Sequence, residues 1–295
     1  MQLRFKHRTL MLDGPPRLIG IVNITPDSFY DGGVSATPQA AIERALEMEQ
    51  AGASVIDLGG MTARPGVVLS TDQEAARVVP AVAGLRERSE VVISVDTYRS
   101  EVAAAVLDAG ADLINDHTGL SDPRLAATVA GHGGGLVVTD LGLAPKQVQG
   151  GRYDTSVSEI AEALVRRARQ AESAGVDPLA IALDPGLGFG KSTASDLATL
   201  RGLPRLLELG RPLLLACSHK EVTAEPLGLP EHALEGTAAV VAVAAHLGVH
   251  LLRVHDLPFM AHVARMGWLT APRSAAYADG GVRSGANAGR NRPPL

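Results

Sequence analysis

Apolar and polar positions follow a repeating pattern along this chain. Four times a run with helical spacing ends at a glycine, continues into a short apolar run, and then meets polar residues. These instances are Ala51–Gly60, Ala109–Gly119, Ala174–Gly186 and Leu247–Asp256. A glycine just past the last helical turn supplies the left-handed residue that ends a helix, so each instance predicts a helix, its cap and a buried strand.

Four further strands are predicted between these instances, from apolar runs at residues 18–22, 91–95, 136–139 and 213–216. None of them shows the polar alternation of a half-exposed strand, and each precedes a segment with helical periodicity, such as the one that follows Thr37 and Pro38. Other helices are expected to begin at serines suited to capping: Ser100, Ser121, Ser158 and Ser195. Eight strands alternating with helices favour one closed (β/α)₈ TIM barrel with parallel strands over an open doubly wound sheet.

The barrel is expected to be one domain over residues 18–269, which suits a chain of 295 residues. Residues 1–17 form an N-terminal extension in this interpretation. Residues 270–295 are rich in Gly, Ala, Asn, Pro and Arg without any period, so we expect them to form a disordered tail.

Composition narrows the class of ligand. Hydrophobic residues make up 46% of the chain and charged residues 20%, which is typical of a globular protein. The formal net charge is −5 and no basic block precedes the last two dozen residues, so neither a nucleic acid nor a membrane is the expected partner. The single cysteine, Cys217, excludes an internal disulfide and favours the cytoplasm. Small molecules are therefore the expected substrates.

Polar residues stand at the C-terminal end of almost every predicted strand, which is where a TIM barrel carries its active site. They are Asn23, Asp57, Asp96, Asn115, Asp116, Asp184, Ser218, Lys220, Arg253 and His255. One such aspartate usually caps the next helix, but several in one pocket need donors, as the N–H-bearing edge of a flat heterocycle provides. Arg253, His255 and Asn23 suit a phosphate group and its magnesium ion. The pattern predicts a heterocyclic substrate that bears a phosphate.

Other chemical motifs are weaker. The run Asp184–Ser192 resembles a phosphate-binding loop, but its first glycine lies one residue too close to the Gly-Lys pair, so a tight strand-to-helix turn is the better interpretation. Cys217 is expected to be a buried small residue rather than a nucleophile. The isolated histidines His117, His132 and His246 are expected to be structural or surface groups.

Seven segments together resemble the signature segments of dihydropteroate synthases, a match that runs from about Leu18 to Leu269. In order they are Asn23–Gly33, Arg64–Gly66, Ser94–Thr97, Ile114–Asp116, Leu183–Lys191, Ser218–Lys220 and Arg253–Asp256. The first, fifth and last are long and specific. The resemblance implies a folate-biosynthesis transferase that joins 6-hydroxymethyl-7,8-dihydropterin diphosphate to p-aminobenzoate and releases pyrophosphate, with Mg²⁺ as cofactor, and that commonly forms a homodimer.

The resemblance also implies roles for residues of this chain. The pterin would be held by Asp96, Asn115, Asp184 and Lys220. The magnesium ion would be bound by Asn23 and the diphosphate by Arg253 and His255. The p-aminobenzoate side would be lined by Arg64, Pro65, Phe189 and Ser218. The residues assigned to catalysis are Lys220, Asp96 and Asp27.

This chain departs from the family pattern in three loops. Met61 replaces a glutamate and Ala63 a threonine, His219 replaces an arginine and Glu221 a serine, and Thr139 and Asp140 stand where a Met-His pair is usual. Losing an oriented hydrogen bond costs about 1–3 kcal/mol, and Glu221 would repel anionic substrates. Two alternatives therefore stay open. One is a catalytically impaired paralogue that binds pterin weakly or has a non-catalytic role, and the other is another pterin-dependent transferase on the same barrel.

Overall fold

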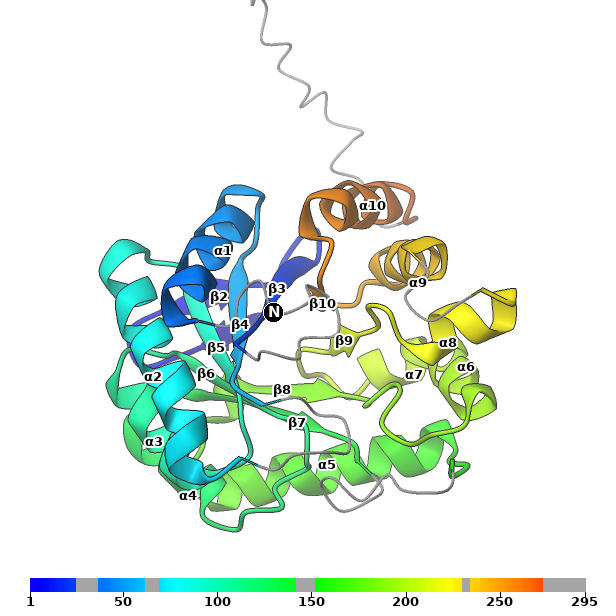
Figure 1. The fold of residues 1–295 in the computed structure, drawn as a ribbon. Helices are drawn as coiled ribbons and strands as arrows, with labels where there is room; N and C mark the ends of the chain where they lie inside the picture. Colours follow the sequence, from blue (N-terminus) through cyan, green and yellow to red (C-terminus); the bar gives the residue numbers. More distant parts are fainter. Residues whose placement is uncertain (25–36, 62–68, 142–151, 230–233, 273–295) are drawn as a thin grey trace, which may run out of the picture.

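Eight parallel strands form the barrel, and helices surround them (Figure 1). The computed structural model describes residues 1–24, 37–61, 69–141, 152–229 and 234–272. The barrel strands are β3 (Arg17–Asn23), β4 (Val55–Gly59), β5 (Val92–Asp96), β6 (Leu113–Asp116), β7 (Gly135–Thr139), β8 (Ile181–Asp184), β9 (Leu214–Ala216) and β10 (Leu251–Val254). The TIM-barrel prediction is confirmed.

Helices connect the strands and cover the outside of the barrel. They are α1 (Pro38–Gln50), α2 (Thr71–Arg88), α3 (Ser100–Asp108), α4 (Leu125–His132), α5 (Val157–Ser173), α6 (Thr193–Arg201), α7 (Leu203–Leu207), α8 (Glu221–Ala224), α9 (Leu234–Leu247) and α10 (Leu257–Leu269). Two 3₁₀ turns, η1 (Pro178–Ala180) and η2 (Glu225–Leu227), complete the described elements.

The strands pair in the order β8-β7-β6-β5-β4-β3-β10-β9, with parallel registers throughout. The two end strands of this order, β8 and β9, meet at an isolated parallel bridge between Leu183 and Leu213. The amide of Leu183 also donates to the carbonyl of Pro212 at 2.9 Å. This junction closes the barrel with less pairing than the other junctions have.

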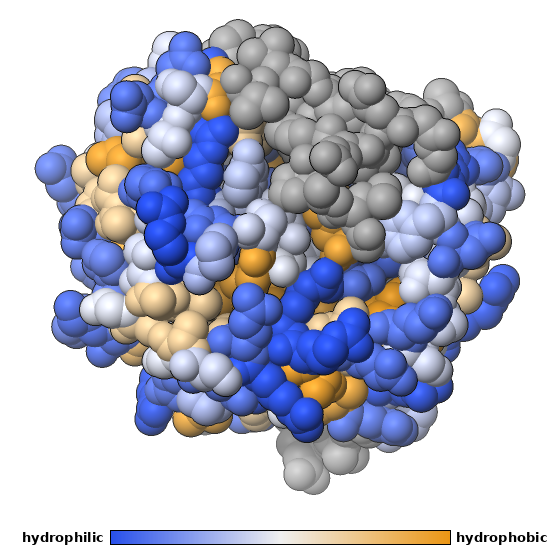
Figure 2. Space-filling view, turned by 90° about the horizontal axis from the view of Figure 1, so that it is seen from below, coloured by the Kyte–Doolittle hydropathy of each residue, from blue (hydrophilic) through white to orange (hydrophobic). Residues whose placement is uncertain are grey.

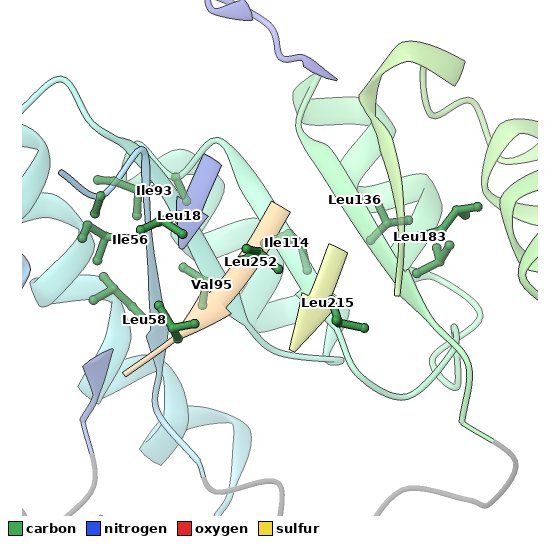
Figure 3. Close-up of a cluster of buried hydrophobic side chains, with 14 of the residues drawn as sticks. Leu18, Ile56, Leu58, Ile93, Val95, Ile114, Leu136, Leu183, Leu215 and Leu252 are labelled. Atoms are coloured by element: carbon green, nitrogen blue, oxygen red, sulfur yellow. The ribbon is translucent and has the colours of Figure 1, made fainter. Parts of the chain in front are cut away.

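Side chains of each strand alternate between two apolar layers. Ile56 and Leu58 of β4, Ile93 and Val95 of β5 and Ile114 of β6 belong to the layer that packs against the helices (Figure 3). The residues between them in sequence, beginning with Val55, Val92 and Leu113, fill the interior of the barrel. This alternation decides which polar residue at a strand end can reach the mouth.

An antiparallel hairpin of β1 (Gln2–Arg4) and β2 (Thr9–Met11) precedes the barrel. Its side chains Leu3, Phe5 and Leu12 are buried in the interior layer, together with residues near the start of the barrel strands. The hairpin therefore covers the N-terminal end of the barrel. The boundaries predicted for the extension and the barrel stay a prediction, and the predicted tail beyond residue 272 lies outside the described residues.

Of the five predicted helix starts, two agree with the structure and three differ. Thr37 caps α1 with Pro38 in the first turn, as predicted. However, α5 is capped by Ser156 rather than Ser158, because Ser156 forms a reciprocal capping box with Glu159. Similarly, α6 is capped by Ser192, three residues before Ser195. Helix α3 begins at Ser100, whereas α4 begins only at Leu125 and Ser121 lies in the loop before it.

The face seen in Figure 2 is largely hydrophilic, with apolar side chains scattered among the polar ones. Across the described residues, no helix is both long enough and apolar enough to cross a membrane.

Candidate active site

A buried charge network spans the mouth of the barrel. Asp57 of β4 is fully buried, and its Oδ2 accepts hydrogen bonds from Arg253 Nε at 2.6 Å and from Asn115 Nδ2 at 3.1 Å. Arg253 of β10 also donates through Nη2 to Asp96 Oδ2 of β5 at 3.2 Å. Four strands, distant in sequence, therefore present polar groups to one space.

Strand alternation explains which residues take part. Asp57, Asp96, Asn115 and Arg253 each lie an even number of residues after an interior apolar residue of the same strand, such as Val55 for Asp57. Asp116 follows Asn115 and has the opposite parity. Its carboxylate accepts hydrogen bonds from Thr118 and Leu120 instead, which folds the turn after β6. The two polar residues that end β6 thus have different roles.

Burial and neighbouring charge shift the pKa of the cation. Burial lowers the pKa of the Arg253 guanidinium, but Asp57 and Asp96 more than offset this effect, so the pKa lies above its ordinary value. Arg253 is therefore a permanent positive charge between two carboxylates. Asp57 Oδ1 is buried and accepts no hydrogen bond within the described part of the chain.

A second group lies across the junction of β8 and β9. Burial raises the pKa of the Asp184 carboxyl, with the charge of Lys220 acting against this rise. Burial likewise lowers the pKa of the Lys220 ammonium, opposed chiefly by Asp184 and Asp196. Lys220 Nζ donates to the carbonyl of Leu187 and lies 4.5 Å from the centre of the Phe189 ring. The loop after β8 therefore shapes the surroundings of this lysine.

His117 belongs to this mouth, which corrects the expectation that it is an isolated structural or surface group. Its Nδ1 lies 2.7 Å from Asp96 Oδ1, and its ring stacks on Phe189 with centres 5.8 Å apart and planes 6° from parallel. Burial lowers the pKa of His117, but the charge of Asp96 and its hydrogen bond outweigh this effect, so the pKa lies above its ordinary value. The sequence signal was its position two residues after Asn115, with the same strand parity.

Of the other predicted site residues, some have contacts in the structure and the rest lie outside the described residues. Ser218 Oγ lies 3.0 Å from His255 Nδ1, and His255 also donates its amide to this oxygen. Asn23 ends β3 beside Gly59, and a Cβ on Gly59 would lie 3.3 Å from Asn23 Oδ1 and 3.8 Å from Asp96 Cβ. The remaining predicted residues, Asp27, Arg64 and Pro65, lie outside the described residues, as does Ala63.

Lys191 is structural, which supports the interpretation of its loop as a tight turn. Its buried Nζ donates to the carbonyls of Asp140, Pro185 and Gly186 at 2.9–3.0 Å and lies 3.1 Å from Asp140 Oδ2. Arg167 binds the other carboxylate oxygen of Asp140 at 2.8 Å. Asp140, one of the departures from the family pattern, therefore fastens the end of β7 to the loop after β8.

Two other departures have defined surroundings. His219 has a φ of 55°, and its Nε2 lies 2.5 Å from Asp256 Oδ2. Glu221 is half exposed and pairs with Arg152 at 2.7 Å, so its charge is balanced on the outer side of the loop. This pairing weakens the expected repulsion of anionic substrates. Met61 is buried.

The described residues contain no cluster of three or more His, Cys, Asp or Glu side chains arranged for a metal ion. They do place the neutral amide oxygen of Asn23 beside the mouth. Mg²⁺ is commonly bound by one or two protein oxygens together with substrate phosphates, so this donor fits a substrate-bound magnesium ion and not a preformed metal cage.

Cys217 is fully buried, and burial raises the pKa of its thiol to about 12. This supports the prediction of a packed, unreactive residue.

The comparisons with known proteins all indicate the same family. The family model described as pterin binding enzyme matches residues 19–255. The dihydropteroate synthase of Bacillus subtilis is 38% identical over 267 residues, covering 90% of this chain and 89% of that protein. The inactive dihydropteroate synthase 2 of Mycobacterium leprae is 39% identical over 257 residues, covering 84% and 88%.

Among solved structures, the sulfonamide complex of Yersinia pestis dihydropteroate synthase superposes with a TM-score of 0.86 at 34% identity, covering 92% of this chain and 98% of that one. The barrel, the order of its motifs and these similarities agree. The chain therefore belongs to the dihydropteroate synthase family of pterin-binding enzymes.

Proposed function

We propose that this protein is a folate-biosynthesis transferase that forms 7,8-dihydropteroate and pyrophosphate from 6-hydroxymethyl-7,8-dihydropterin diphosphate and p-aminobenzoate. The observation that carries the assignment is the network of Asp57, Asn115, Arg253 and Asp96 at the mouth of a barrel of this family. A flat ring with several N–H groups suits such a set of carboxylate and amide oxygens.

The pterin contacts come from strands β5, β6 and β8 and from the loop after β9. Asp96, Asn115 and Asp184 supply acceptors around the ring, and Lys220 supplies a donor. An ammonium has three N–H bonds, so Lys220 can hold the carbonyl of Leu187 and also a pterin oxygen or nitrogen. Burial lowers the pKa of Lys220, and the charges of Asp184 and Asp196 oppose this effect and favour the protonated donor.

The diphosphate is bound by Arg253 and His255, and Asn23 would hold a magnesium ion together with it. Mg²⁺ neutralises charge on the leaving diphosphate when it is bound. Arg253 is aimed by Asp57 and Asp96, so its guanidinium is fixed before substrate arrives. His255 is oriented by its contact with Ser218.

The p-aminobenzoate side is assigned to Arg64, Pro65, Phe189 and Ser218. Phe189 stacks on His117 and lies under Lys220, so its ring forms a wall between this side and the pterin side. The arylamine nitrogen is nucleophilic without a strong base.

In the reaction, the C–O bond between the pterin methylene and the diphosphate breaks, and its electron pair leaves with the diphosphate. The arylamine lone pair forms the new C–N bond, and the amine proton passes to solvent. Lys220, Asp96 and Asp27 are the residues assigned to catalysis: Lys220 and Asp96 hold the ring over which the developing positive charge spreads.

A second candidate function is that of a catalytically impaired paralogue that binds pterin weakly or has a non-catalytic role. It is favoured by the altered loops at Met61, Ala63 and His219 and by the similarity to the M. leprae protein, whose name describes it as inactive. The pairing of Glu221 with Arg152 weakens one of the arguments for it.

A pyrophosphate-release assay with and without p-aminobenzoate, in the presence of Mg²⁺, separates these functions. We expect release that depends on p-aminobenzoate and is lost in Lys220→Ala. Pterin binding by calorimetry without any release at high enzyme concentration would establish the impaired paralogue instead. Absence of both binding and release would reject both candidates.

We further propose a homodimer in the cytoplasm. Three large apolar side chains on the last two helices are substantially exposed: Val243 on α9 and Phe259 and Met266 on α10. Burying such side chains in a second copy would remove them from water. Sedimentation analysis of the wild type and of Met266→Glu tests this, and a wild-type monomer at micromolar concentration would reject the dimer.

A further inference from the structure

A buried carboxylate outside the assigned site lies beneath the loop that follows β8. Asp196, in the first turn of α6, is 2% exposed. Its Oδ2 accepts a hydrogen bond from the amide of Gly188 at 2.8 Å, and its Oδ1 is buried and has no hydrogen-bond partner among the described residues. The cap of α6 is Ser192, so Asp196 is not needed to begin its own helix.

The same short loop touches both Asp196 and Lys220. Gly188 gives its amide to Asp196, while the preceding residue, Leu187, gives its carbonyl to Lys220 Nζ. The following residue, Phe189, places its ring 4.5 Å from that nitrogen. The loop passes so close to the lysine that a Cβ on Gly188 would lie 2.8 Å from Lys220 Cδ. Whatever fixes Gly188 therefore also fixes the surroundings of Lys220.

The charges around Asp196 indicate which cation it stabilises. Lys220, Lys191, Glu221 and Arg152 all act on Asp196 electrostatically or are acted on by it. Lys191 is already paired with Asp140, and Arg152 is paired with Glu221 and Glu225. Lys220 is also the stronger of the two lysines in its effect on Asp196.

Lys220 in turn faces charged and titratable groups from three neighbours besides Asp196. They are Asp184, Arg253 and Cys217. Asp184 favours the charged ammonium, Arg253 opposes it, and burial opposes it most. Asp196 is a second carboxylate that acts on Lys220, and its negative charge raises the pKa of the ammonium.

We propose that Asp196 is a positioning residue for Lys220: it anchors the Leu187–Phe189 loop through Gly188 and supplies a buried negative charge that keeps the Lys220 ammonium protonated for pterin binding. The proposal deepens the proposed function and rests on it for the identity of the ligand. Burial raises the pKa of Asp196 to about 6, so the charge is lost on mild acidification.

The central variant is Asp196→Asn, which keeps an oxygen for the Gly188 amide but removes the charge. Asp196→Ala removes both. Asp72→Asn is the matched control, because Asp72 is an exposed aspartate in the first turn of another helix. The chain has four lysines, so the ε-carbon NMR signals of ¹³C-labelled lysine are few, and Lys220→Arg assigns the signal of Lys220.

We expect the Lys220 signal to titrate at lower pH in Asp196→Asn than in the wild type, and Asp72→Asn to leave it unchanged. Exchange of the Gly188 amide hydrogen should stay slow in Asp196→Asn and become faster in Asp196→Ala. An unchanged Lys220 titration in Asp196→Asn would overturn the electrostatic part of the proposal. Equal Gly188 exchange in all variants would overturn the anchoring part.

Pterin binding by calorimetry provides the functional test. Affinity in the wild type should rise as pH increases through about 6, and this rise should be absent in Asp196→Asn. If no variant, the wild type included, binds pterin while the Lys220 titration still shifts, the proposed function fails and the positioning of Lys220 by Asp196 stands. If pterin binds but its pH dependence is the same in both proteins, the positioning role is rejected.

A reciprocal measurement covers the case in which Asp196→Asn does not fold. Removing the Lys220 charge in Lys220→Met must raise the pKa of Asp196 in the ¹³C carboxyl spectrum, because coupling between two sites is mutual. An Asp196 titration that is unaffected by Lys220→Met would reject the link.

Discussion

At the scale of single residues, Arg253 determines the charge balance of the mouth. It contacts Asp57 of β4 and Asp96 of β5 and is mostly buried, so removing it would leave two carboxylates without their cation. Breaking a buried ion pair by removing one partner is strongly destabilising, because the remaining charge keeps its desolvation penalty.

We therefore expect Arg253→Met to lower the free energy of unfolding by about 3–5 kcal/mol, measured by urea denaturation at neutral pH. Arg88→Met is the matched control. Arg88 also pairs with an acidic residue, Glu43, but both side chains are largely in solvent. Its removal should leave the unfolding midpoint unchanged, and equal destabilisation by both variants would contradict the account.

His117 carries a prediction about proton binding. Its pKa is raised because Asp96 outweighs the effect of burial. In Asp96→Asn, burial and the charge of Arg253 still lower the pKa of His117 and only Asp116 still raises it, so we expect this pKa, measured by imidazole NMR, to fall relative to the wild type. Since the folded-state pKa in the wild type is raised, protonated His117 adds stability below its unfolded pKa of about 6.5, and that stability is lost as pH rises through the folded pKa. No change in the His117 titration would show that Asp96 is not the cause.

The mouth residues could be predicted from the sequence to a useful degree, for a simple reason. Barrel strands end at a common rim, so Asp96, Asn115 and Asp184 could be placed together without coordinates. The sequence analysis did not consider which face of a strand each end residue occupies. That alternation directs Asn115 and His117 to the mouth and Asp116 to the turn after β6. Asp196 was beyond prediction, because a helix residue reaches the site only through the path of the preceding loop.

At the scale of secondary-structure elements, strand and helix identities followed from local patterns, but helix starts did not. Several serines and threonines stand close together before α5, and each could accept from the first turn. The reciprocal bond with Glu159 selects Ser156. A capping choice depends on such pair geometry more than on residue type.

This choice can be tested within one helix. Ser156→Ala should lower the free energy of unfolding by about 1 kcal/mol, whereas Ser158→Ala, two residues later, should change it by less than about 0.5 kcal/mol. Thermal unfolding of the two variants measures the difference. Equal losses would mean that the cap does not contribute as its geometry indicates.

At the scale of the whole molecule, the N-terminal hairpin packs its apolar side chains against the interior layer of the barrel. The sequence pattern set residues 1–17 apart because they lack the helix-to-strand repeat, and that pattern carries no information about long-range packing. Phe5 nevertheless lies against Gly135 of β7, where a Cβ would come within 2.6 Å of its ring. The absence of a side chain at residue 135 makes room for this ring.

Phe5→Ala should accordingly lower the free energy of unfolding of the whole barrel by about 3–5 kcal/mol. Met11→Ala, in the same hairpin but with its side chain 47% exposed, should change it by less than about 0.5 kcal/mol. Guanidinium denaturation curves of both proteins provide the comparison. A hairpin that unfolds separately would instead give Phe5→Ala no effect on the main transition.

The sparse pairing between β8 and β9 has a consequence for ligand binding. Asp184 ends β8, and Lys220 lies in the loop that follows β9. A pterin bound by both residues would therefore connect the two strands that share the least backbone pairing in the barrel. A ligand that binds only the folded barrel and holds both strands would stabilise this junction, so we expect bound pterin to raise the free energy of unfolding.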